Sequence, residues 1–175
     1  MKFNYQGFKA IYLHEMDRFR RTLLQSLISP VLSTSLYFIV FGSVIGGYVE
    51  NIDGISYGSY IVPGLLMLTL LTQSISNTSF GIFFPKFNGT IYEILAAPIS
   101  TFETVLAFVG AGATKTLIVG VVIFFTSTFF VEVYVEKPLL MICLLILVAF
   151  TFALFGFLIG LMSSNFEQLS VIPTL

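Results

Sequence analysis

Polar side chains that could do chemistry are few in this chain, and the first group lies inside a long apolar segment. Thr69, Gln73 and Asn77 are spaced four residues apart, so they share one face of a helix. Such a face either lines a path for a polar part of a substrate or supplies hydrogen bonds between packed helices. The sequence leaves both interpretations open.

Lys115 is a charged residue inside another apolar segment. At the middle of a bilayer a lysine costs about 3 kcal/mol on insertion scales, unless it faces the bundle interior, water or a partner. Alternatively the membrane segment begins at residue 116, and the lysine extends to the inner headgroups along its alkyl chain. The first interpretation gives Lys115 a role in the interior, and the second makes it a surface residue.

The third region with candidate functional residues is the loop 85–103 between two apolar segments. Gly89 and Pro98 bracket residues 90–97, which predicts a helix of two turns. Thr90 is expected to be its N-cap, with Glu93 at the third helical position as in a capping box.

This short helix carries Ile91, Ile94 and Leu95 on one side. Isolated helices of this length are marginal in water, so the apolar face predicts a partner. The alternative is that it folds back onto the bilayer or onto the chain's own helices.

Composition places these residues in a membrane protein. Of the 175 residues, 57% are hydrophobic and 10% are charged, whereas soluble domains carry about a quarter charged residues. This excludes an ordinary soluble enzyme, a disordered regulator and a secreted disulfide scaffold. A net charge of -1 offers no basic surface for nucleic acid, and the single Cys143 cannot form an internal bridge.

Long apolar runs predict an all-α, polytopic transmembrane helix bundle, because about 20 apolar residues span a bilayer and the runs lack the alternation of barrel strands. The chain ends on an apolar stretch, which predicts that it is a fragment. The expected complete spans are 22–48, 57–84, 104–131 and 138–162, with the start of a fifth at about 168–175.

Lysine and arginine predict the orientation, because cytoplasmic segments are enriched in both. With the N-terminus in the cytoplasm, six of these residues lie inside and one outside, leaving Lys115 uncounted. The inside residues are Lys2, Lys9, Arg18, Arg20, Arg21 and Lys86, and the outside residue is Lys137.

Residues 1–21 are predicted to form a cytoplasmic amphipathic helix at the membrane interface. Its expected function is either to anchor the chain among membrane lipids or to contact a partner. The apolar face is Phe8, Tyr12, Met16 and Phe19, and the polar side is Lys9, His14, Asp17, Arg18 and Arg21.

The segment from Tyr60 to Gly64, YIVPG, and the segment from Asn88 to Ser100, NGTIYEILAAPIS, resemble the permease subunit of ABC type 2 exporters. The resemblance extends over essentially the whole chain. It implies six spans, of which the last two lie beyond this sequence, a permease homodimer in the bacterial inner (plasma) membrane, and separate ATP-binding subunits. The exported substrate would be hydrophobic and drug-like, or a glycan or lipid-linked molecule.

The same resemblance implies that the loop helix couples the permease to the ATPase. It implies no catalytic, cofactor or metal residue on this chain, because ATP and Mg²⁺ would bind the partner. The residues assigned to coupling are Gly89, Thr90, Ile91, Glu93, Ile94, Leu95 and Pro98.

Two other function classes stay open. A transporter driven by an ion gradient would need intramembrane carboxylates, and the first, second and fourth predicted spans contain no Asp or Glu. A structural scaffold would leave the loop helix without an ATPase partner.

The predicted orientation can be tested by thiol labelling in a full-length permease with Cys143 replaced by Ser. A cysteine at Asp53 should react with an impermeant reagent from outside the cell. A cysteine at Asn88 should react only after the membrane is opened. Labelling of position 88 from outside would reverse the topology.

Overall fold

The computed structural model describes residues 3–45, 51–52, 55–133 and 135–171. These residues form a bundle of helices with one short antiparallel pair of strands. The helices are α1 Tyr5–Arg21, α2 Leu23–Tyr37, the π-helical η1 Phe38–Ile45, α3 Tyr57–Asn88, α4 Ile91–Ala96, α5 Thr101–Ser127, α6 Pro138–Met162 and α7 Phe166–Val171, and the strands are β1 Asn51–Ile52 and β2 Ile55–Ser56.

Four of the described helical segments are long and apolar enough to cross a membrane: Leu23–Phe41, Tyr57–Asn88, Thr101–Ser127 and Pro138–Met162. The predicted all-α polytopic bundle is confirmed. Residues 46–48 of the first predicted span and residues 172–175 of the predicted fifth segment lie outside the described residues.

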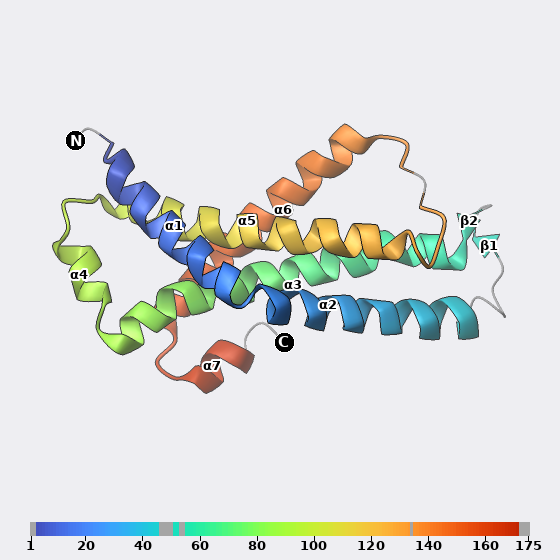
Figure 1. Cartoon of the computed structure of the whole chain (residues 1–175), viewed down its shortest axis with the longest axis horizontal. Helices are drawn as coiled ribbons and strands as arrows, with labels where there is room; N and C mark the ends of the chain where they lie inside the picture. Colours follow the sequence, from blue (N-terminus) through green and yellow to red (C-terminus); the bar gives the residue numbers. More distant parts are fainter. Residues whose placement is uncertain (1–2, 46–50, 53–54, 134, 172–175) are drawn as a thin grey trace.

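The chain runs back and forth along the long axis of the bundle (Figure 1). The start of α1 and the short helix α4 lie at one end, and α7 lies beside the same half of the bundle. The strand pair and the connection from α5 to α6 lie at the other end. The loop 85–103 and the leader are therefore neighbours in space, although the first membrane hairpin separates them in sequence.

Helix α3 packs closely against α6 because small residues let the two backbones approach. A Cβ added at Gly156 would meet the backbone of Ile75, and one at Gly160 would meet the backbone of Ser79. Ala149 and Ala153 on α6 are also fully buried. Contacts between small residues are the usual way in which helices associate within lipid, where apolar burial supplies little driving force.

The ends of α3 and α6 are joined by Lys86. Its ammonium group donates to the carbonyl oxygens of Leu161 at 2.7 Å and of Ser163 at 3.0 Å. These carbonyls belong to the C-terminal end of α6, which carries the negative end of the helix dipole. Phe83 of α3 contacts Phe166 edge-on at a centroid distance of 4.9 Å, so α7 is held against the same helix.

We expect Gly156→Ala and Gly160→Ala each to destabilise the bundle by about 1–3 kcal/mol, because the added methyl group would enter the neighbouring backbone. Thermal unfolding of the purified full-length permease in detergent measures this change. Gly64→Ala is the matched control, since a Cβ at Gly64 meets nothing within 4 Å. Equal stability of the Gly156 variant and the control would contradict the proposed close packing.

Candidate functional site

Helix α4 forms where the sequence predicted a short helix. Gly89 ends α3 with a φ of 79°, a left-handed conformation that glycine adopts without strain. The chain then turns into α4 and leaves it just before Pro98. Two sharp changes of direction thus set α4 apart from the long helices on either side.

The predicted capping box at Thr90 and Glu93 is wrong. Thr90 has helical backbone angles (φ −62°, ψ −18°), and its side chain makes no capping hydrogen bond. An N-cap side chain reaches the free N–H groups from an extended backbone, which the tight turn after Gly89 does not allow here. The N–H of Glu93 instead donates to the carbonyl of Thr90 at 3.1 Å.

A complete capping box lies at the start of α5. The Ser100 hydroxyl accepts from the N–H of Glu103 at 3.3 Å, and the Glu103 carboxylate accepts from the N–H of Ser100 at 2.7 Å. The pattern S-x-x-E before an apolar run is visible in the sequence and could have revealed it. The other Glu103 oxygen accepts from the backbone N–H of Asn4, whose side chain donates to the carbonyl of Pro98 at 3.0 Å.

The apolar face of α4 is divided between two environments. Ile91 and Ile94 pack against the core cluster that contains Ile11 of α1. Leu95 is 72% exposed and Tyr92 is 73% exposed. The prediction of one outward face with Ile91, Ile94 and Leu95 is therefore corrected: the two isoleucines hold α4 on its own chain, and Leu95 with Tyr92 faces outward.

Helix α1 lies against α5 of the same chain. Ile11, Glu15 and Phe19 are its buried residues, spaced four residues apart. The expected burial of the apolar side of this helix in lipid is replaced by contact with the bundle, in which the Tyr12 hydroxyl donates to Thr114 at 3.0 Å. His14 is solvated as predicted, with 76% of its side chain exposed.

Lys115 lies in the interior, and the alternative that it extends to the headgroups is wrong. Lys115 is 2% exposed, and helix α5 continues through this position without a break. The ammonium group lies 2.7 Å from Glu15 Oε2, and Arg18 Nη2 lies 2.8 Å from the same oxygen. Lys115 does not need to extend to the lipid headgroups, because Glu15 supplies its counter-charge inside the bundle.

The role of Glu15 was missed because its partner lies 100 residues away in sequence. One signal was available: Glu15 interrupts the row Ile11, Glu15, Phe19, which is otherwise apolar. An acid in an apolar row predicts a cation opposite it.

Small residues of α3 border this ion pair. A Cβ at Gly81 would lie 3.2 Å from Glu15 Oε2, and one at Gly112 of α5 would collide with Thr78. Within the described residues, Glu15 Oε1, Ser74 Oγ and Thr78 Oγ1 are buried without a hydrogen-bond partner. A polar seam therefore follows the junction of α1, α3 and α5.

Thr69, Gln73 and Asn77 lie on a different side of α3 and are half-buried. Thr69 donates to the carbonyl of Leu65 at 2.8 Å, and Asn77 donates to Gln73 at 3.4 Å. In the part of the chain that the structure describes, the hydrogen bonds of these three side chains stay on α3. Other hydroxyls, those of Ser74 and Thr78, face the neighbouring helices.

The described residues contain no group of three or more His, Cys, Asp or Glu side chains that could hold a metal ion.

Residues 6–175 match the ABC-2 type transporter family. The chain belongs to this family.

Curated relatives agree with this membership. The ABC-2 family chain is 37% identical over 166 residues to the inner membrane transport permease YadH of Escherichia coli strain K12, and it matches YadH of Shigella flexneri to the same extent. The match covers 95% of this chain and 65% of each relative, so the chain spans about two thirds of their length. No solved structure matches the chain significantly. With its four apolar helices, this ABC-2 family member is a multi-pass membrane protein.

The buried pair can be measured by a double-mutant cycle on the full-length permease. Glu15→Gln alone should lower the free energy of unfolding by about 3–5 kcal/mol, because it leaves the buried Lys115 without an anionic partner. Lys115→Met alone should lower it by less, because Glu15 still pairs with Arg18. The free energy of unfolding that the double variant loses should be smaller than the sum of the losses in the two single variants. Thermal unfolding in detergent provides the measurement.

Asp17 and Arg20 on the same helix supply a matched control. Their side chains are 61% and 78% exposed and lie 4.0 Å apart. Exposed pairs contribute about 0–1 kcal/mol, so Asp17→Asn and Arg20→Gln should change stability little. Equal effects at the two pairs would show that Lys115 is not paired in the interior.

Proposed function

We propose that this chain is the membrane-spanning permease subunit of an ATP-driven exporter and that α4 docks onto a separate ATP-binding subunit. The observation that carries the proposal is the division of the α4 surface. Ile91 and Ile94 fasten the helix to its own chain, while Tyr92 and Leu95 face outward at one end of the bundle. Membership of the ABC-2 type transporter family supports it independently.

Each residue of the loop has a place in this proposal. Gly89 allows the reversal after α3, Thr90 begins the turn, and Pro98 ends the short helix. Glu93 is exposed beside Tyr92 and is available to a basic group of the ATPase. ATP and Mg²⁺ bind the partner, and this chain transmits its motion without hydrolysing ATP.

Transmission follows from the connections of α4. The turn at Gly89 joins it to α3, and the Ser100–Glu103 capping box fixes the start of α5. When ATP draws two partner subunits together, a displacement of α4 moves the ends of both membrane helices. Two copies of the permease then open a path between them toward the outside.

The polar face of α3 is a candidate lining for that path. Gln73 lies near the middle of this 32-residue helix, and its neighbours Thr69 and Asn77 are half-buried. Neutral amides and hydroxyls at that depth suit a largely apolar substrate with a few polar groups, such as a hydrophobic drug-like molecule or a lipid-linked glycan. Lys115 instead belongs to the packing of α1 on α5.

In the orientation that we propose, the N-terminus, α4 and α7 lie in the cytoplasm of a bacterial cell, and the strand pair lies outside. The excess of Lys and Arg at the α4 end supports this assignment. A gradient-driven transporter would need carboxylates that are free to exchange ions. The buried Glu15 and Glu103 instead accept hydrogen bonds from Lys115 and from backbone N–H groups, respectively.

Truncating Tyr92 and Leu95 together to Ala should weaken association with the ATPase by about 2–4 kcal/mol, because exposed apolar anchors typically carry much of an interface's energy. Co-purification of the ATP-binding subunit with the full-length permease measures this effect. The variant should insert and unfold as the native protein does, since both side chains lie outside the packed core.

Phe129→Ala with Leu139→Ala is the matched control. These side chains are 88% and 77% exposed, close to the values for Tyr92 and Leu95. Phe129 follows α5 and Leu139 lies in the first turn of α6, so they belong to the two ends of the α5–α6 connection, away from α4. The control should keep the ATPase bound. Normal co-purification by the Tyr92/Leu95 variant would favour a structural scaffold over a coupled permease.

A further inference from the structure

Helices α1 and α5 are joined by polar contacts at three levels. The Glu103 carboxylate accepts from the backbone of Asn4, Tyr12 donates to Thr114, and Glu15 pairs with Lys115. These contacts follow the same order along both helices, so α1 and α5 run parallel.

The third contact fixes the register of α1 on α5. Glu15 and Lys115 are both 2% exposed, and separating them leaves Lys115 buried without a counter-charge, while Glu15 keeps only Arg18 of its own helix. A slip of α1 along α5 by one helical turn, about 5.4 Å, would separate Glu15 from Lys115 in this way. Apolar packing alone tolerates such a slip far better, because dispersion contacts are not directional.

The first contact joins α1 to the segment that follows α4. The Asn4 side chain donates to the carbonyl of Pro98, and a Cβ at Gly7 would lie 2.6 Å from Ile99 Cγ1. At its other end, α1 leads through Thr22 directly into α2. Helix α1 thus connects the segment after α4 with the first membrane helix by a route that bypasses α3.

We infer that Glu15 and Lys115 are positioning residues for coupling: they hold α1 and α5 as one unit, so that a displacement of α4 moves α5 and, through α1, also α2. This inference rests on the proposed docking of α4 to an ATPase. Arg18 of the same helix holds the Glu15 carboxylate in place, since its guanidinium donates to the same Glu15 oxygen. Gly81 leaves the space in which that oxygen lies.

The test compares the native pair with the variant Glu15→Leu/Lys115→Met, which keeps apolar packing and removes the charges. Both are made in the full-length permease with Cys143→Ser, purified with the ATP-binding subunit and placed in liposomes of Escherichia coli lipid. The variant should co-purify with the ATPase normally. Its permease-stimulated kcat for ATP hydrolysis should fall about fivefold or more, the lower end of common coupling effects, with KM for ATP unchanged.

A disulfide between Gly7→Cys and Ile99→Cys should restore the lost activity. The two Cβ positions are close enough for the roughly 3.5–4.5 Å that a disulfide needs. Oxidation then fixes the register that the charges no longer hold, and the reduced protein serves as its own control. With the native charges present, the disulfide should leave hydrolysis unchanged, because α1 and α5 already move together.

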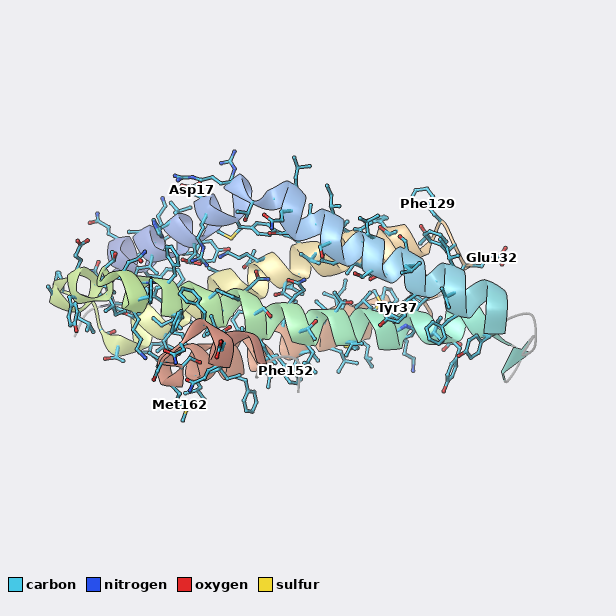
Figure 2. The ribbon with its side chains drawn as sticks, turned by 90° about the horizontal axis from the view of Figure 1, so that it is seen from below. Asp17, Tyr37, Phe129, Glu132, Phe152 and Met162 are labelled. Carbon is cyan, nitrogen blue, oxygen red and sulfur yellow. The ribbon has the colours of Figure 1, made fainter. Side chains whose placement is uncertain are left out.

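Asp17→Asn/Arg20→Gln is the control for loss of charge, and Figure 2 shows Asp17 pointing away from the bundle. This variant should hydrolyse ATP as the native protein does. Native kcat in the Glu15/Lys115 variant would overturn the inference. Inhibition by the disulfide in the presence of the native charges would also overturn it, because α1 would then have to slide on α5.

If the Leu/Met variant does not accumulate, Glu15→Gln/Lys115→Gln, which keeps the hydrogen-bonding groups, is measured against the same outcomes. If the native permease stimulates no ATPase, the proposed function fails, and the rate of disulfide formation in membranes decides the register inference. That rate should be about fivefold lower without the charges. Equal rates would overturn the inference.

Discussion

A charge inside an apolar bundle needs a partner of opposite charge, and the placement of α1 depends on this constraint. Lys115 lies in the third long helix, where its ammonium group is shielded from water. Glu15 meets it at 2.7 Å and brings the leader helix with it. The pair requires the two helices to meet in one register, because every other register leaves the buried Lys115 without a counter-charge. The leader is consequently part of the bundle and leads into α2 from a fixed position.

Helix α3 provides the surface against which the other long helices pack. Glycines and alanines on α5 and α6 allow their backbones to reach it, and its own small residue Gly81 makes room for Glu15. This type of packing keeps helices together in lipid, where apolar side chains gain little by leaving the surrounding hydrocarbon. Lys86 and Phe166 extend the contact to the end of α6 and to α7. A displacement at the α4 end of α3 would therefore be felt by its neighbours.

The loop around α4 gathers several connections in a short stretch of chain. Gly89 reverses the chain, Ile91 and Ile94 bind the helix to the core, and Glu103 ties the beginning of α5 to Asn4. Tyr92 and Leu95 are left exposed on this well-supported element. A rigid platform with a small apolar surface suits the transmission of force better than a flexible loop would, which is why the proposed coupling role is physically reasonable.

The sequence by itself determined the features that depend on local composition and spacing. Long apolar runs indicate membrane helices because hydrocarbon excludes charges, Gly89 and Pro98 delimit α4 because of their backbone geometry, and the YIVPG and loop motifs identify the family. The orientation stays a prediction from the Lys and Arg distribution.

Only the tertiary structure decided which side chains meet. The pairing of Glu15 with Lys115 joins residues 100 positions apart, so no local pattern could specify it. The division of the α4 face between Ile94 and Leu95 depends on where α1 and α5 lie around it. In each case the physical reason is the same: periodicity tells which residues share a face, but burial and counter-charges come from neighbours that the chain brings together only when it folds.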